Sequence, residues 1–220
     1  MAEPEAVRKP RPYHAPRRAE QAAATRAAIV DAASTLVAER GYAGTTMAAI
    51  AAKAQVAAKS VYVLAEKPQL LLLALDRAIT GDDEPVPLAD RPDARALLQA
   101  TDPREQVERA AALGAALLLR LYPLYRAFEQ ATAAEPELSN AWHDYQQRRR
   151  ADVTRVVDAV RRTGGLRPGL TPEKAVDTVW ALITWHPVAL LVEERGWGAA
   201  ELTEWLRDLL ATLLLPPATT

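Results

Sequence analysis

The stretch from Thr45 to Lys67, TTMAAIAAKAQVAAKSVYVLAEK, decides the expected fold. Its apolar spacing predicts two short helices that meet across a turn at about residues 54–56, each with one apolar stripe facing inward. Thr45 or Thr46 can cap the first helix. The second helix, from Ala57 to about Leu64, turns small residues, a cation and a tyrosine outward, as a helix that enters the major groove of DNA requires. The sequence therefore predicts a helix-turn-helix.

A longer run around this stretch resembles the DNA-binding domain of the TetR family of bacterial transcriptional regulators. It extends from Thr25 to Leu75, TRAAIVDAASTLVAERGYAGTTMAAIAAKAQVAAKSVYVLAEKPQLLLLAL. The resemblance is carried by E-R-G-Y ending a first helix, T-T opening the second, S-V-Y in the recognition helix, and a lysine before a leucine-rich fourth helix. The entry to that fourth helix and the segment E-E-R-G-W at residues 193–197 resemble an actinobacterial-type subgroup.

Two features differ from the family pattern. The turn commonly has glycine where this chain has Gln55, and a non-glycine residue in a left-handed conformation costs roughly 1 kcal/mol. The segment between Tyr62 and Lys67 is also about one residue shorter than is usual, and it lacks the usual aromatic residue after the recognition helix. Neither difference is large enough to exclude the fold.

The resemblance and the outward face of the second helix together give a set of expected DNA contacts. Tyr62 and Lys67 match family positions that contact phosphates, and Thr46 would bind a third phosphate beside its helix N-terminus. Lys59 is the long polar side chain best placed to read guanine, while alanine side chains can touch thymine methyl groups. The full expected set is Thr46, Ala57, Ala58, Lys59, Ser60, Tyr62 and Lys67.

Composition favours an all-helical protein. Half of the 220 residues are apolar, alanine and leucine dominate, and cysteine is absent, which excludes disulfides and thiolate chemistry. Residues 1–80 hold 11 Lys or Arg against 7 Asp or Glu, a net +4, whereas residues 81–220 have a net −5. A basic front end on an acidic body is typical of a modular DNA-binding protein. We expect a cytoplasmic protein without a membrane partner, since no apolar run approaches about 20 residues.

The expected organisation is all-α, with a TetR-like order of parts. Residues 1–20 form a flexible basic arm, residues 21–67 a three-helix DNA-binding domain, and residues 68–220 a helical regulatory and dimerisation domain. The arm, with Arg8, Lys9, Arg11, Arg17 and Arg18, is either a DNA contact or a solvated tail. Body helices are expected at residues 69–79, 94–100, 103–121, 124–134, 136–162, 172–195 and 199–215, with a break at Pro123.

The resemblance implies that the last two helices, at about 172–195 and 199–215, pair with their copies in a homodimer, and their many apolar residues agree with this. It also implies a regulatory cavity, for which aromatic walls with a few polar tips suit a largely apolar small molecule. Pro187, inside an expected helix, would free the carbonyl of Ile183 and kink the axis. The candidate effector residues are Tyr122, Tyr125, Arg126, Phe128, Trp142, Trp180, Trp185 and His186.

Catalysis has little support in the sequence. The chain contains no G-x-S-x-G, no G-x-G-x-x-G, no phosphate-binding glycine loop and no H-E-x-x-H. His143 and Asp144 are neighbours, and helix neighbours point about 100° apart, so they do not share a site. We therefore expect neither an enzyme nor a cofactor or metal. The expected function is a DNA-binding repressor released by a small effector; the alternatives are an activator, a regulator controlled by a protein partner, or a helical enzyme or carrier.

Overall fold

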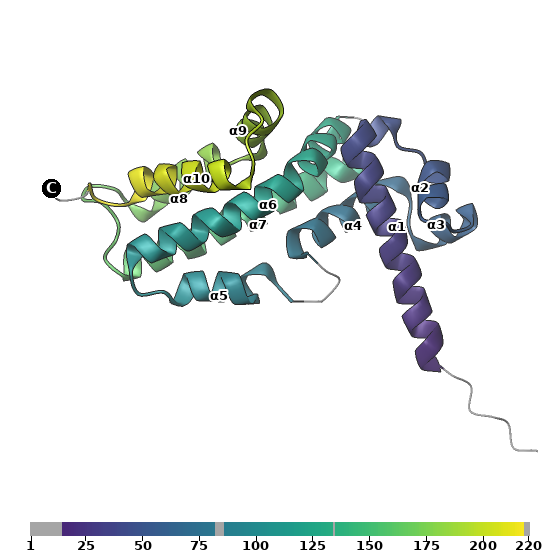
Figure 1. Ribbon diagram of the computed structural model, residues 1–220, viewed down its shortest axis with the longest axis horizontal. Helices are drawn as coiled ribbons and strands as arrows, with labels where there is room; N and C mark the ends of the chain where they lie inside the picture. The colour runs from purple at the N-terminus through teal and green to yellow at the C-terminus, as the bar shows by residue number, and fades with distance from the viewer. Residues whose placement is uncertain (1–14, 82–85, 134, 218–220) are drawn as a thin grey trace, which may run out of the picture.

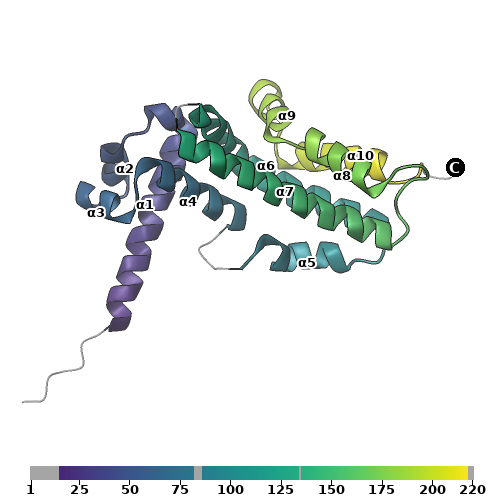
Figure 2. The same cartoon turned by 180° about the vertical axis from the view of Figure 1, so that it is seen from behind.

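The computed structural model describes residues 15–81, 86–133 and 135–217, and these residues contain helices and no strand. The all-α prediction is confirmed. A group of N-terminal helices lies at one end of an elongated helical body, and the first turns of the N-terminal helix project away from that end (Figures 1 and 2). The helices are α1 (Ala15–Gly44), α2 (Met47–Lys53), α3 (Ala58–Leu64), α4 (Lys67–Thr80), η1 (Leu88–Asp90), α5 (Pro92–Gln99), α6 (Pro103–Thr132), α7 (Pro136–Arg162), α8 (Pro172–Leu182), α9 (Trp185–Ala189), the π-helical turn η2 (Leu190–Glu194) and α10 (Ala199–Leu214).

The first four helices build a small core of their own. Ile29, Ala33 and Leu36 on one face of α1 pack against Ile50 of α2 and Val61 of α3. Regular helix in α1 ends at Gly41, whose φ of 72° is a conformation that glycine adopts at no steric cost. The sequence prediction of a stop at this glycine is confirmed.

Helix α4 belongs to two cores at once. Leu70 packs into the core of α1 to α3, whereas Leu71, Leu75 and Ala78 pack into a second core with α1, α6 and α7. Consecutive helical residues point about 100° apart, so burial of both Leu70 and Leu71 requires neighbours on two sides. The leucine-rich sequence of α4 supplies apolar side chains to both cores.

The body is built on the antiparallel pair α6 and α7, which a short connection joins. One end of this pair contributes Leu124, Phe128 and Leu138 to the second core. The other end forms a third core with α8 and α10, in which Val160, Leu202 and Leu206 are almost inaccessible to solvent. Helix α5 covers the opposite side of the pair (Figure 1).

Two helix boundaries differ from the predictions. Pro123 does not break the chain, because α6 runs through it from Pro103 to Thr132. The proline costs one backbone hydrogen bond, and the buried residues on both sides of it, from Leu121 to Phe128, hold the helix together. In contrast, the helix expected at 172–195 is interrupted after Leu182 and restarts at Trp185.

The predicted arm differs in extent from the structure. Helix α1 begins at Ala15, so residues 15–20 are helical and continue directly into the helix that was expected from residue 21. Arg8, Lys9 and Arg11 lie outside the described residues. Residues 19–28 include six alanines, which favour this extension because alanine has the highest intrinsic helix propensity.

The packing predicts opposite effects for alanine at two glycines. A Cβ atom at Gly165 would overlap with Cβ of Pro103, so Gly165→Ala should lower the free energy of unfolding by about 1 to 3 kcal/mol. A Cβ atom at Gly114 within α6 would lie 3.7 Å from a methyl group of Leu206, an ordinary contact. Gly114→Ala should therefore be neutral or stabilising by up to about 1 kcal/mol. Urea unfolding of both variants measures the difference, and equal effects would contradict it.

Candidate functional site

The helix-turn-helix has the predicted geometry. The chain bends by 110° between α2 and α3. The Thr46 hydroxyl accepts a hydrogen bond from the Ala49 amide at 3.1 Å and caps α2, while the buried Thr45 donates to the Gly41 carbonyl at 2.8 Å. Gln55 adopts a φ of 56°, so the turn uses the left-handed conformation without the glycine that would make it free of strain.

Helix α3 presents one face to the protein and the other to solvent. Val61 is fully buried against α1 and α2, whereas Tyr62 is 62% exposed and Val63 is 76% exposed. Exposed side chains of this size on a short helix are not explained by packing. Ala57, Ala58 and Lys59 are also exposed, and Ser60 is half-buried. The predicted contact residues of α3 therefore lie on or beside one open surface.

Lys67 lies elsewhere, at the junction with the body. Its ammonium is 4.2 Å from the centroid of the Tyr42 ring, and the Tyr42 hydroxyl donates to Oε1 of Glu135 at 3.3 Å. Burial lowers the pKa of Lys67, and the nearby Glu135 carboxylate opposes that change. Burial and Glu135 raise the pKa of Tyr42 to about 12. The structure thus groups Lys67 with α1 and α7 rather than with the open face of α3.

A cavity of about 870 Å³ lies in the body, between α4, α5, α6, α7 and the break after α8. Its walls are mostly apolar, and the polar lining residues are contributed by several elements, with the largest share from α7. Four of the eight predicted effector residues line it: Tyr125, Trp142, Trp185 and His186. Cavities of this size and composition bind drug-sized molecules.

The other four predicted residues are not among the lining residues. Arg126 forms an ion pair with Glu193 at 2.7 Å, and Phe128 is fully buried against the edge of Trp142. Tyr122 packs on the third core, and Trp180 packs beside Arg149. The three aromatic residues among them therefore serve packing, and Arg126 serves an ion pair.

Arg149 explains the interruption after α8, and sequence reasoning missed it. Its guanidinium donates to the carbonyl of Trp180 at 2.6 Å and to that of Ile183 at 2.9 Å. These are carbonyls at a helix end, which lack intrahelical partners. Pro187 then occupies the first turn of α9, where its missing amide costs nothing. The prediction that the Ile183 carbonyl is free of its helical bond is confirmed, with an arginine from α7 as its new partner.

The cavity also holds carboxylates that the sequence did not single out. Asp76 of α4 and Asp152 of α7 line it, and burial raises the pKa of both side chains, opposed by nearby arginines. Asp76 forms a long ion pair with Arg148 at 3.9 Å. Only the pairing of helices in space brings these residues together, so no local motif could have revealed them.

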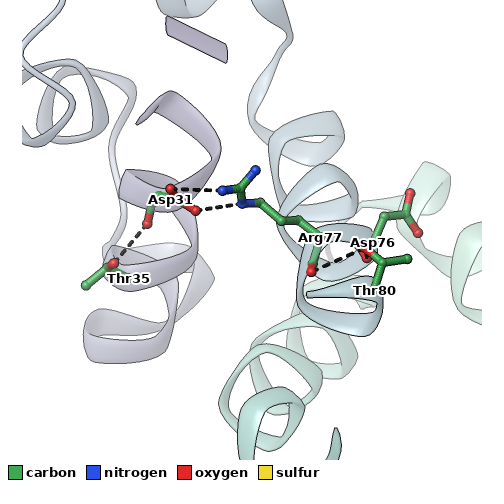
Figure 3. Close-up of polar contacts among 5 residues, drawn as sticks. All are labelled: Asp31, Thr35, Asp76, Arg77 and Thr80. Atoms are coloured by element: carbon green, nitrogen blue, oxygen red, sulfur yellow. Dashed lines mark hydrogen bonds and ion pairs between the residues drawn. The ribbon is translucent and has the colours of Figure 1, made fainter. Parts of the chain in front are cut away.

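Adjacent residues of α4 reach in opposite directions. Asp76 faces the cavity, whereas Arg77 reaches α1 and binds Asp31 with Nε to Oδ1 at 2.8 Å (Figure 3). Thr35 and Thr80 each donate to a backbone carbonyl one turn earlier in their own helices, that of Asp31 and that of Asp76. One turn of α4 therefore contacts both the cavity and α1.

Sequence comparison identifies the DNA-binding part. The profile of the bacterial regulatory proteins of the tetR family matches residues 29–64, which contain α2, the turn and α3. These residues match the DNA-binding domain of the TetR family. Among curated proteins, none matches the chain in sequence.

Solved structures show that this TetR-family fold extends over the body. FadR from Bacillus subtilis, in complex with stearoyl-CoA, has a TM-score of 0.68 at 16% identity, covering 86% of this chain and 98% of its own. A protein from Saccharomonospora viridis, in complex with choline, has a TM-score of 0.68 at 20% identity and coverages of 87% and 97%. NalD, the secondary repressor of a multidrug efflux pump in Pseudomonas aeruginosa, has a TM-score of 0.63 at 22% identity and coverages of 88% and 97%.

The bridge from Arg149 gives a stability prediction. Arg149→Met removes the donors for the Trp180 and Ile183 carbonyls, so the free energy of unfolding should fall by about 1 to 3 kcal/mol. Arg150→Met is the matched control, since Arg150 is exposed and pairs only with the surface carboxylate of Asp177 in the contacts described. Surface pairs contribute about 0 to 1 kcal/mol. Equal losses for the two variants in urea unfolding would show that the bridge is not needed.

Proposed function

We propose that this chain is a dimeric transcriptional repressor that a small, largely apolar effector releases from its operator. The exposed face of α3 carries the proposal, because its geometry is that of a helix that enters the major groove and its side chains have no packing role. Regulators of the family are generally DNA-binding proteins rather than enzymes. We propose the same for this chain, acting in the cytoplasm.

The proposed DNA contacts are of two kinds: contacts to phosphates, which position the protein on the duplex, and contacts to bases, which recognise the sequence. Tyr62 would donate its hydroxyl to a phosphate, and Thr46 would bind a second phosphate beside the first amides of α2. Lys59 would read guanine from the start of α3, with Ala57, Ala58 and Ser60 close to the bases. Lys67 would reach a further phosphate while its ammonium rests on the ring of Tyr42.

A second copy of the chain is the proposed partner of α8 and α10. The segment Pro172–Glu194 is long enough and apolar enough to cross a membrane. Only 28% of its most apolar 18 residues are buried within the chain, so much of its apolar surface is exposed. Leu182 is 46% exposed and Leu190 is 63% exposed. A twofold partner would cover this surface, and two copies of α3 would then read half-sites about 34 to 36 Å apart or a multiple of that distance.

The cavity supports the effector part of the proposal. Nε1 of Trp185 is buried without a hydrogen-bond partner among the described residues, and the Trp185 ring lines the cavity. An unsatisfied buried donor costs about 1 to 3 kcal/mol, so a ligand with an acceptor near Trp185 would gain affinity there. We propose an apolar molecule with at least one such acceptor.

The route from cavity to DNA is proposed to run through α4. A ligand changes the operator affinity only if it binds one arrangement of the protein more tightly than the other. Asp76 meets the cavity, and its neighbour Arg77 holds α1 through Asp31. A ligand that displaces Asp76 would therefore shift α1 and with it the spacing of the two α3 helices.

Two substitutions on α3 separate reading from positioning. Lys59→Ala should relax the preference at one base position by roughly 1 to 3 kcal/mol, while Tyr62→Phe should weaken all sequences about equally. Lys67→Ala should behave as Tyr62→Phe does. Selection of bound sequences from random DNA, followed by affinity measurements on the preferred and substituted duplexes, tests both effects. An unchanged preferred sequence for Lys59→Ala would mean that Lys59 contacts a phosphate.

The dimer proposal predicts a change of mass. Leu182→Glu with Leu190→Glu places charge on two exposed leucines, so the folded subunit should persist while the dimer dissociates and operator affinity falls at least about tenfold. Analytical ultracentrifugation measures the mass, with Arg104→Glu at the exposed start of α6 as the control. A wild-type chain that sediments as a monomer would refute this part of the proposal.

A further inference from the structure

The first turns of α1 project beyond the core. Of the described side chains from Arg18 to Ala28 none is buried, and the packed residues of α1 begin at Ile29. At about 1.5 Å per residue, the helix before Ile29 is about 20 Å long. Figures 1 and 2 show its first turns extending past α2 and α3 and away from the body. Such a helix gains little from packing within the chain, so a partner would stabilise it.

A groove of about 760 Å³ lies between this projecting half of α1 and helix α3. Its walls include three cationic side chains, Arg18, Arg26 and Lys59, and no carboxylate is among its described lining residues. Hydrogen-bonding groups of Thr25 and Ser60 also line it. An open basic groove with hydroxyl groups has the chemistry that recognises phosphate oxygens.

The groove is continuous with the face of α3 that is proposed to bind DNA. Lys59 and Val63 are exposed on α3, and both line the groove as well. A duplex seated against α3 would therefore pass the mouth of the groove. Along α1, Arg26 lies eight residues after Arg18, a rise of about 12 Å, which is close to the rise of three to four base pairs.

We propose that the projecting half of α1 is a second DNA-binding element. Arg18 and Arg26 bind phosphates of the strand that flanks the base pairs contacted by α3. This inference rests on the proposed DNA-binding function and extends it, because α1 lengthens each half-site by about three to four base pairs without reading their sequence. The added contacts increase affinity for all sequences and leave the choice of bases to α3.

The experiment uses the full chain and a duplex selected from random DNA, with the ends of the protected region defined by footprinting. Affinity is measured over a salt series for the wild type, Arg26→Ala, Arg18→Ala with Arg26→Ala, Arg26→Lys, and the control Arg104→Ala. A second duplex is shortened by about four base pairs at each end of the footprint. Circular dichroism and thermal unfolding check that each variant keeps its fold.

The plot of log K against log salt has a negative slope, and each lost phosphate contact should reduce the magnitude of that slope by about 0.9. We expect a decrease of about one for Arg26→Ala and about two for the double variant, counted per subunit. Arg26→Lys should keep the slope, since it keeps the charge, and Arg104→Ala should match the wild type. The shortened duplex should weaken wild-type binding about tenfold or more and leave the double variant nearly unchanged.

Two results would overturn the inference, and they can be told apart. In the first, the wild type binds the selected duplex, the arginine variants keep its salt slope, and the variants lose as much affinity as the wild type on the shortened duplex. In that case α1 does not bind the flanking DNA, and the proposed DNA-binding function is unaffected. If the wild type selects no DNA even at low salt, the proposed function and the inference fail together.

Discussion

The burial of α4 on two sides is the constraint on which the rest of the structure depends. Leu70 faces the core of the helix-turn-helix, and Leu71 and Leu75 face the core shared with α6 and α7. Each buried leucine contributes about 1.5 to 3 kcal/mol, so separating α4 from either core is unfavourable. The two parts of the molecule therefore move, if they move at all, by a shift of α4 with both cores attached. Two neighbouring residues of this helix add polar contacts: Asp76 lines the cavity, and Arg77 forms an ion pair with Asp31 of α1.

The cavity exists because a helix is interrupted beside it. A continuous helix over residues 172–195 would place Trp185 and His186 along the same straight cylinder as α8. The break after Leu182 turns α9 away from α8 (Figure 1) and brings both rings to the cavity wall, where His186 stacks on Trp185 with centroids 3.7 Å apart. Arg149 satisfies the carbonyls that the break exposes, and its own burial lowers the pKa of the guanidinium. One arginine thus makes an otherwise costly backbone arrangement tolerable.

Local chemistry is what the sequence predicted well. The cap at Thr46, the turn at Gln55 and the stop at Gly41 depend on residues within one or two helical turns of each other, so their signals are contained in short segments. The helix α7 was predicted with its observed bounds because prolines and glycines surround it. Pro123 gave a wrong boundary for the opposite reason: burial on both sides of α6, which is not a local property, outweighs the lost hydrogen bond.

The candidate site was predictable only in part. Aromatic residues in the body indicated a cavity, but aromatic side chains fill cores as readily as they line cavities, and Phe128 and Tyr122 belong to the first kind. Asp76 is more than 70 residues away from Arg149 and Asp152 in the sequence. Arg149 and Asp152 belong to the stretch R-R-R-A-D of α7, whose sequence is typical of a charged, solvent-exposed surface. Their role depends on the assembled fold.

The separation of the buried and open faces of α3 bears on how such a protein diversifies. Val61 is the fully buried anchor of α3 and Leu64 packs beside it, whereas Lys59, Tyr62 and Val63 are exposed. Under the proposed function, a new residue at Lys59 would change the preferred operator without disturbing the core beneath α3. Gene duplication followed by drift on this one surface is thus a short evolutionary route from one regulatory circuit to two.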